Sequence, residues 1–248
     1  VVNRLVRYRE SNNTLAERAV IVDNITASSA HDGGRVRFGP DGKLYWTMGD
    51  AVEPPNAQRL SHMSGKILRV NADGTTPSDN PYGSPVWTWG HRNPQGIDWN
   101  PITGDAWATE HGAIGNDELN LIRKGVNYGW PIIQADQSRP DMERPVLYFA
   151  PSIAPSGLSF YRALRIQPFR NNIFIAALRG MHIHRVILDP ANPASVQAAE
   201  RLLEGRFGRI RDVVTGPDGA LYFCTSNRDG RTSPAASDDR IARIVPVQ

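Results

Sequence analysis

The sequence predicts an all-β fold of the β-propeller type, and three observations lead to this prediction. Short β-rich runs with a period of two alternate with turn signals along the chain, while helical periodicity is scarce. The turn phrase Gly-Pro-Asp-Gly stands between two such runs at residues 39–42 and again at 216–219. The 248 residues include 22 glycines and 19 prolines, a content typical of a fold with many turns. Returning strand–turn–strand units of this kind indicate a propeller.

Four units follow one another, each made of a strand, a turn and a second strand. Their paired strands are expected at 35–38 and 44–48, 96–99 and 106–109, 158–161 and 172–176, and 212–214 and 221–223. A further strand is expected after each unit, at 66–70, 118–122, 182–188 and 241–245. A β-sandwich is the alternative, since it also contains many short strands, but it does not explain the returning Gly-Pro-Asp-Gly phrase.

Residues 1–27 stand before the first of these units. Residues 2–8 and 18–22 have the pattern of the outer strands of a preceding blade whose inner strands are absent. We therefore expect residues 1–248 to form one propeller domain with about four blades and part of another. The domain is expected to be N-terminally truncated, with residues 1–27 as the remnant of the preceding blade.

The composition excludes several classes of protein. Cys224 is the single cysteine, which excludes an internal disulfide framework and a cysteine-rich metal site. The formal net charge of +3 is too small to indicate a nucleic-acid partner, so any role of positive charge is expected to be local. No run approaches the roughly 18 consecutive apolar residues of a membrane-spanning helix.

Two polar clusters stand directly before predicted inner strands. Residues 31–35, His-Asp-Gly-Gly-Arg, place a histidine beside two glycines, where its side chain can project into a central channel without crowding. Residues 90–96, Gly-His-Arg-Asn-Pro-Gln-Gly, bring several donors together around Arg92, which suits a polar, anionic ligand. An exposed loop histidine and a structural arginine are the alternatives.

A third cluster, at residues 208–212, is rich in arginine. Strand alternation puts Arg209 and Arg211 on one face, and Arg179 has a similar place in the preceding unit. Like charges on one face repel, so they need an anion or water between them. A solvated surface pair is the alternative.

Two segments contain possible metal ligands. Residues 110–118 form an acidic, glycine-bearing loop of the kind that offers carboxylates and carbonyls to calcium, although an acidic loop without metal remains open. His182 and His184 share one strand face and could bind a transition metal, but no third ligand is evident.

Taken together, these sequence motifs resemble those of one known family. They occur in its order, as His31-Asp32-Gly33-Gly34-Arg35, Gly39-Pro40-Asp41-Gly42, Gly49-Asp50, Gly90-His91-Arg92-Asn93-Pro94-Gln95-Gly96, Asn127-Tyr128-Gly129-Trp130-Pro131 and Arg209-Ile210-Arg211-Asp212-Val213. The chain resembles the soluble aldose (glucose/sorbosone) dehydrogenases that depend on pyrroloquinoline quinone (PQQ). Members of this family are six-bladed propellers that oxidise sugars.

The resemblance implies a cofactor, two calcium sites and the residues that bind them. PQQ is a planar ortho-quinone with three carboxylates and therefore needs cationic partners. The implied PQQ-binding residues are Arg92 and Asn93 near the quinone oxygens, the hydroxyl of Ser152, and the cationic cradle of Arg179, Arg209 and Arg211. The implied metal ligands are the carbonyls of Gly112 and Ala113 for calcium at the quinone, and Glu118 with the main chain of Tyr128 for a structural calcium.

The resemblance also implies a catalytic mechanism. His31 is expected to be the general base that takes the proton of the anomeric hydroxyl while hydride passes to the quinone. Asp50 is expected to orient His31 and to stabilise its imidazolium. Arg92 and calcium are expected to stabilise negative charge on the quinone oxygen. The sugar would leave as a lactone, and an external electron acceptor would reoxidise the cofactor.

The family resemblance further implies a periplasmic or secreted location and leaves the oligomeric state open. Two other functions remain as alternatives. One is a calcium-dependent propeller lactonase or other hydrolase, which the clustered arginines disfavour because they suit a polyanion better than a neutral lactone. The other is a non-catalytic sugar-binding propeller fragment.

Overall fold

The computed structural model describes residues 1–247 and confirms that the fold is all-β. Its helical content, in the described residues, is limited to two 3-10 helices, η1 (Pro54–Gln58) and η2 (Gln167–Phe169). Proline stands at the beginning of each of these helices, where its missing N–H costs no hydrogen bond. Strands and turns make up most of the rest.

The strands form five antiparallel sheets, and each sheet uses consecutive strands. The first sheet is the hairpin of β1 (Val2–Ser11) and β2 (Thr14–Thr26). The second contains β3 (Val36–Phe38), β4 (Leu44–Met48), β5 (Lys66–Val70) and β6 (Val86–Trp89). The third contains β7 (Pro94–Trp99), β8 (Ala106–Glu110), β9 (Asp117–Ile122) and β10 (Leu147–Phe149).

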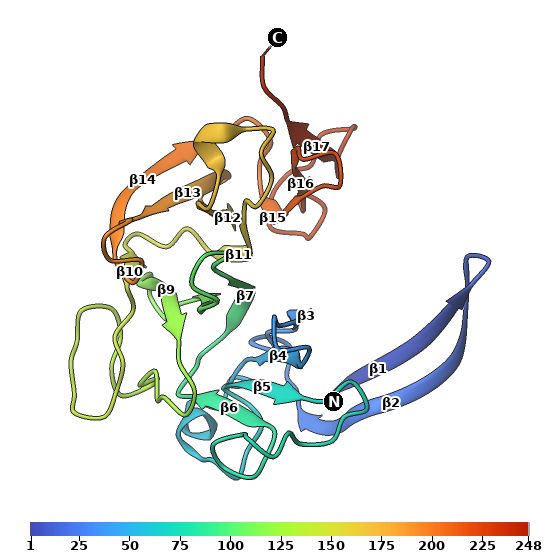
Figure 1. Cartoon of the computed structure of the whole chain (residues 1–248), viewed down its shortest axis with the longest axis vertical. Coiled ribbons are helices and arrows are strands. Elements are labelled where there is room, and N and C mark those ends of the chain that lie inside the picture. The colour runs from blue at the N-terminus through green and yellow to red at the C-terminus, as the bar shows by residue number, and fades with distance from the viewer. Residues whose placement is uncertain (248) are drawn as a thin grey trace.

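The last two sheets follow the same plan. The fourth contains β11 (Pro155–Phe160), β12 (Ile173–Ala177), β13 (His182–Leu188) and β14 (Val196–Leu202). The fifth has three strands, β15 (Ile210–Thr215), β16 (Leu221–Thr225) and β17 (Ile241–Ile244). The four larger sheets follow one another along an arc, with β3, β7, β11 and β15 on its inner side (Figure 1). This is a propeller-like arrangement.

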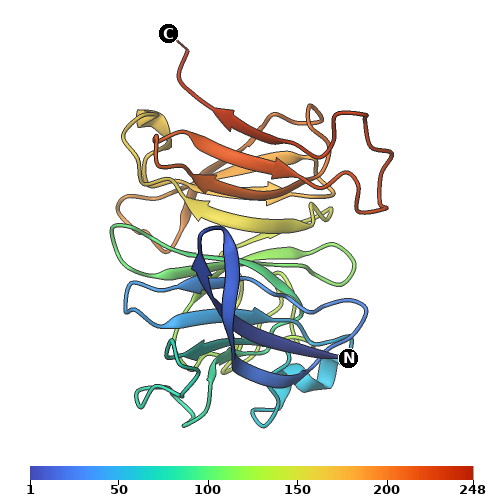
Figure 2. The same cartoon turned by 90° about the vertical axis from the view of Figure 1, so that its right-hand side faces the viewer.

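The β1–β2 hairpin extends away from the other sheets in Figure 1 and crosses in front of them in the view of Figure 2. Its two strands pair along most of their length, with register shifts that curve the ribbon. The end near Ile25 packs into a core with Trp46, Met48 and Leu68 of the second sheet. The hairpin is therefore attached to that sheet at one end, while its tip is exposed.

The hydrophobic cores lie between successive sheets. Ile67 of the second sheet meets Ile97 of the third, and Trp107 of the third meets Phe160 of the fourth. A third core joins the fourth sheet to Val213 and its neighbours in the fifth. Each fully buried side chain of this kind contributes roughly 1.5–3 kcal/mol. Packing between the sheets thus fixes the positions of the inner strands relative to one another.

Most predicted strands are confirmed, and His182–Leu188 has the predicted bounds. The outermost strands β6, β10 and β14 were not predicted individually. β10 is only three residues long, and most of β14 is exposed and polar, so neither carries a strong hydrophobic alternation. The fifth sheet has three strands, all of them predicted.

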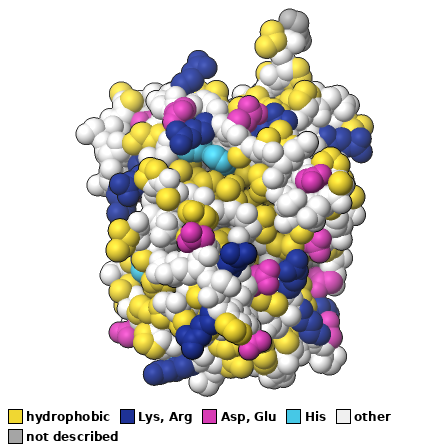
Figure 3. All heavy atoms as spheres, turned by 90° about the vertical axis from the view of Figure 1, so that its left-hand side faces the viewer, with side chains coloured by type: hydrophobic (Ala, Val, Ile, Leu, Met, Phe, Trp, Pro, Cys, Tyr) yellow, Lys and Arg dark blue, Asp and Glu magenta, His cyan; other side chains and the backbone are white. Residues whose placement is uncertain are grey.

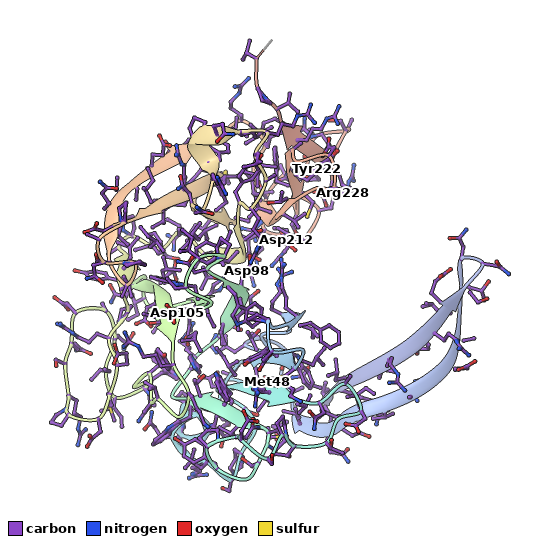
Figure 4. The ribbon with its side chains drawn as sticks, viewed as in Figure 1. Met48, Asp98, Asp105, Asp212, Tyr222 and Arg228 are labelled. Atoms are coloured by element: carbon purple, nitrogen blue, oxygen red, sulfur yellow. The ribbon has the colours of Figure 1, made fainter. Side chains whose placement is uncertain are left out.

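No helix within residues 1–247 is long and apolar enough to cross a membrane. The face formed by the outer strands mixes hydrophobic side chains with scattered acidic and basic ones (Figure 3). The polar side chains of interest for function lie instead toward the inner strands. Figure 4 shows Asp98 of β7 and Asp212 of β15 on this inner side.

Candidate active site

A cavity of about 600 Å³ lies at the end of the molecule where the inner strands begin. The loops before β3, β7 and β11, the start of β15 and the loops that follow β8, β12 and β16 all contribute to its wall. The lining residues are Ser29, Ala30, His31, Arg92, Asn93, Gln95, His111, Gly112, Asp117, Ser152, Ala154, Leu178, Arg179, Arg209, Arg211 and Arg231. The predicted site residues among them are His31, Arg92, Asn93, Gly112, Ser152, Arg179, Arg209 and Arg211.

His31 forms a hydrogen bond with a fully buried carboxylate. Its Nδ1 lies 2.8 Å from Oδ1 of Asp50, so the ring donates Nδ1–H and leaves the lone pair on Nε2. The indole Nε1–H of Trp130 donates to the other oxygen of Asp50 at 2.8 Å, and the backbone N–H of Val52 donates to Oδ1. Because Asp50 is held by three donors, it fixes the tautomer and the orientation of His31. The imidazole can then accept a proton at Nε2.

Gly49 allows the segment before Asp50 to pass directly against the loop of His31. The chain at Gly49 passes directly against the His31 carbonyl, and a Cβ at this position would collide with that oxygen. The backbone N–H of Ala51 then donates to the same carbonyl at 3.1 Å. The residues that flank Asp50 in sequence thus hold the loop of His31 in place.

Arg92 is a half-buried cation with few partners. Its Nη1 donates to the carbonyl of His111 at 3.2 Å, and its guanidinium lies 5.4 Å from the ring centroid of Trp130. Its Nε is buried and makes no hydrogen bond within residues 1–247. Burial lowers the pKa of Arg92, although the carboxylates of Asp50 and Glu110 oppose this effect. An anionic group in the cavity would stabilise the charged form of Arg92.

Asn93 stands beside Arg92 and uses its side chain to connect loops. Its Oδ1 accepts hydrogen bonds from the backbone N–H of Gly33 and from Nε2 of Gln95, both at 3.1 Å. Its own backbone N–H donates to Oε1 of Glu110. The carboxamide oxygen is therefore already hydrogen-bonded, and its Nδ2 is the group left to donate to a ligand.

The predicted cradle of three arginines is only partly free of partners. Arg209 donates Nε and Nη2 to Oδ2 of Asp229, at 2.9 and 2.7 Å. Arg211 lies 3.7 Å from the same oxygen and contacts Oγ of Ser156 at 3.4 Å. Arg179 is exposed and forms no ion pair with any residue in 1–247. Burial lowers the pKa of Arg211, with the charge of Asp229 opposing this change.

Asp117 is a lining residue that the sequence analysis did not identify. Its Oδ1 accepts the N–H of Gly112, and its Oδ2 accepts the Ser152 hydroxyl and the N–H groups of Ile153 and Ala154. The carboxylate thereby joins the β8–β9 loop to the segment before β11. Ser152, predicted to contact the cofactor, donates its proton to Asp117 and can offer only a lone pair to a ligand.

The four predicted metal ligands lie around two adjoining cavities. Gly112 lines both cavities, whereas Ala113 is exposed in the same loop and lines neither. Glu118 and Tyr128 lie beside a neighbouring cavity of about 10 Å³, which Glu110 also lines. Within the described chain, no group of three or more His, Cys, Asp or Glu side chains has a metal-binding arrangement.

The small cavity is lined by two carboxylates, together with Arg92 and His111. Glu110 and Glu118 are directly opposed on β8 and β9. Burial, together with the charge of Glu110, raises the pKa of Glu118 to about 8. Oxygen ligands of this kind suit calcium, and a cation there would stabilise both carboxylates.

The family of the chain can now be assigned from its sequence. The family model described as Glucose / Sorbosone dehydrogenase matches residues 1–234. The chain belongs to the glucose/sorbosone dehydrogenase family. This membership agrees with the polar cavity at the beginning of the inner strands and with the resemblance of the sequence motifs.

Relatives within the glucose/sorbosone dehydrogenase family are similar over most of this chain. Aldose sugar dehydrogenase of Escherichia coli is 36% identical over 219 residues, covering 81% of this chain and 58% of that protein. Quinoprotein glucose dehydrogenase B of Acinetobacter calcoaceticus is 28% identical, covering 92% and 65%. The PQQ-bound structure of aldose sugar dehydrogenase from Streptomyces coelicolor has a TM-score of 0.86 and 34% identity, covering 97% of this chain and 71% of that chain.

The chain spans between 55% and 65% of the length of three curated relatives that it matches. The fold likeness therefore concerns the part of the propeller that the chain shares with them. The 97% coverage of this chain shows that nearly all of it has a structural counterpart in the solved relative.

Three residues of the site were missed by sequence reasoning. Trp130 belongs to the quoted Asn-Tyr-Gly-Trp-Pro phrase, yet its role as a donor to Asp50 has no local sequence signal. Asp117 belongs to segment 110–118, which was considered only for calcium. Asp229 lies in the Asn-Arg-Asp-Gly-Arg segment after β16, and the two arginines of this segment, one of which lines the cavity, are the sequence signal that could have indicated it.

Proposed function

We propose that this chain carries the catalytic cavity of a PQQ-dependent aldose dehydrogenase, which oxidises the anomeric hydroxyl of a sugar to a lactone. The observation that carries the proposal is the His31–Asp50 pair at a cavity lined by five arginines. A base held by a buried carboxylate suits proton removal from an alcohol, and the arginines suit a cofactor with three carboxylates. The PQQ-bound relative from Streptomyces coelicolor supports this choice of cofactor.

His31, Asp50 and Arg92 have different roles in the proposed reaction. When bound, PQQ supplies the hydride acceptor. His31 takes the proton of the anomeric hydroxyl at Nε2, and Asp50 stabilises the resulting imidazolium through Nδ1–H. Arg92 supplies a cation with an unused N–H next to this pair, so it can stabilise negative charge that develops on an oxygen.

The same proposal assigns the remaining binding residues. Arg179, Arg209 and Arg211 hold the carboxylates of PQQ, and Asn93 and Ser152 contact its polar edge. Calcium fits beside the cavity at the carbonyls of Gly112 and Ala113, and a structural calcium fits at Glu118 and the main chain of Tyr128. The opposed carboxylates of Glu110 and Glu118 support the second site: burial and the charge of Glu110 raise the pKa of Glu118, and a bound cation would oppose that change.

The architecture in this proposal is a six-bladed ring of which the four larger sheets form four blades. The β1–β2 hairpin is then part of another blade. In this proposal an external electron acceptor takes the electrons from the reduced cofactor, and the protein acts in the periplasm or outside the cell. The lengths of the relatives are consistent with a larger ring.

The test is reconstitution of the purified chain with PQQ and calcium. We expect quinone absorbance to accompany the protein through gel filtration, and an aldose to reduce a dye only when the cofactor is present. Absence of both signals would contradict the proposal. His31→Ala should abolish dye reduction and leave the quinone absorbance in the protein fraction, whereas loss of the absorbance as well would make His31 a structural residue.

A further inference from the structure

The loop between β16 and β17 reaches the cavity and is absent from the predicted binding residues. Arg231 of this loop lines the cavity together with Arg179, Arg209 and Arg211. It is exposed, and its guanidinium makes no ion pair or hydrogen bond within residues 1–247. An arginine that faces a cavity without a countercharge is available to an anionic ligand.

The loop is fastened to the start of β15 by several hydrogen bonds. Asn227 accepts the N–H of Arg209 at Oδ1, at 2.8 Å, and donates Nδ2 to the carbonyl of Phe207. The N–H of Ser226 donates to the carbonyl of Arg209 at 2.9 Å. These bonds place the beginning of the loop directly against the arginine strand, so the position of Arg231 is set by the fold.

Asp229 connects the two arginines through its two carboxylate oxygens. Its Oδ2 accepts both N–H groups from Arg209, and its Oδ1 accepts the backbone N–H of Arg231 at 3.1 Å. The side chain of Arg209 is only 9% exposed and that of Asp229 is 19% exposed, so this ion pair is largely withdrawn from solvent. Arg209 is therefore neutralised within the protein before any ligand binds.

This neutralisation changes the balance of charge in the proposed cofactor site. PQQ brings three carboxylates, and the predicted cradle offers three arginines. Of these, only Arg179 is free of a carboxylate partner, because Asp229 pairs with Arg209 and lies 3.7 Å from Arg211. Counted together with Asp229, the three arginines of the cradle carry two net positive charges, one fewer than the three carboxylates of the cofactor.

We propose that Arg231 is a cofactor-binding residue that supplies this missing cation, with Asp229 as the residue that positions it. The inference rests on the proposed function and extends it to a segment outside the predicted cradle. The loop of the β16–β17 hairpin then forms one wall of the cavity beside the bound anion. The effect should be electrostatic, so it should weaken as the salt concentration rises.

The experiment is a titration of the purified chain with PQQ in calcium-containing buffer, followed by quenching of tryptophan fluorescence. Arg231→Gln should raise the Kd for PQQ by about tenfold or more, since hydrogen bonds to charged groups are worth roughly that factor. Arg231→Lys should retain part of the affinity. The difference between wild type and Arg231→Gln should shrink at high salt.

Arg206→Gln is the matched control, because Arg206 is exposed, forms no ion pair and does not line the cavity. An Arg231→Gln variant that binds PQQ within twofold of wild type would overturn the inference. An equal loss in Arg206→Gln would also overturn it, since it would indicate general surface charge. If the wild-type chain itself fails to bind PQQ, the proposed function is contradicted and this inference falls with it.

Discussion

Arg35 and Asp212 form an ion pair of 2.7 Å between residues that are 177 positions apart in the chain. Arg35 stands just before β3 of the second sheet, and Asp212 lies in β15 of the fifth. Arg35 also donates Nε to the carbonyl of Gln95, at the start of β7. The pair therefore joins the first and last of the four larger sheets at the inner side of the arc, close to the cavity. Figure 4 shows Asp212 at this inner position.

The Arg35–Asp212 pair should stabilise the arrangement of the sheets. Arg35→Met, Asp212→Asn and the double variant, unfolded by denaturant, should give a coupling energy of about 1 kcal/mol, because the side chains are 21% and 32% exposed and partly screened. The exposed pair Arg9–Glu17 is the control and should couple more weakly. Equal coupling energies for the two pairs would contradict a special contribution of the Arg35–Asp212 pair to stability.

Asp50→Asn should separate catalysis from cofactor retention. The variant loses the anionic partner of His31, so dye reduction by the reconstituted enzyme should fall by about 100-fold or more. The Kd for PQQ should stay within about threefold, since Asp50 is not one of the cavity-lining residues. Trp130→Phe removes one donor to Asp50 and should cost less activity. A kcat in Asp50→Asn close to that of wild type would exclude the assigned role.

Asp117→Asn should loosen two loops of the cavity wall at once. The substitution weakens bonds from the N–H groups of Gly112, Ile153 and Ala154, and a loss of about 1–3 kcal/mol of stability is expected. Hydrogen exchange should accelerate at these three amides. Asp136→Asn, at an exposed position, should leave their exchange rates unchanged. Unaltered protection in Asp117→Asn would mean that other contacts hold the loops.

Lys66→Met should destabilise the loop that follows Asp50. The ammonium of Lys66 is fully buried and donates to the carbonyls of Asn56, Ala57 and Ser64, at 2.8, 3.1 and 2.8 Å. A methionine fills the space but leaves three carbonyls without a donor, so a loss of at least about 3 kcal/mol is expected in thermal or denaturant unfolding. Lys124→Met, at an exposed position, should cost under about 0.5 kcal/mol. Similar stabilities of the two variants would contradict this expectation.

His184 should contribute to acid sensitivity. Burial lowers its pKa to about 4, with the neighbouring His182 adding to the effect. His182 donates Nδ1–H to the carbonyl of Gly180, and its Nε2 lies 3.2 Å from Nδ1 of His184. Below its ordinary pKa of 6.5, the unfolded chain binds a proton that the folded chain takes up only near pH 4.

The folded state therefore loses stability as pH falls from about 6.5 to 4, and it keeps the full contribution of His184 above that range. His184→Gln removes the titrating group, so its denaturation midpoint should fall less than that of wild type between pH 6.5 and 4.5. Parallel midpoints for the two proteins across this interval would count against a depressed pKa.

Local sequence patterns predicted much of the fold, for a physical reason. Strand alternation and the Gly-Pro-Asp-Gly turns involve residues a few positions apart, so strands such as β4 and β13 could be placed from the sequence. The short or polar outer strands β10 and β14 could not be placed in this way. They pair with their neighbours through backbone hydrogen bonds that leave little trace in side-chain patterning.

The fold class, the family and eight of the cavity-lining residues were predictable from the sequence, because they depend on local motifs. The partners of those residues depend on the tertiary structure. Asp229 neutralises Arg209 across 20 positions, Trp130 reaches Asp50 across 80, and Arg35 meets Asp212 across 177. Such contacts form where loops of different sheets meet at the inner strands. Electrostatic balance at the site depends on distance in space, which separation along the chain does not reveal.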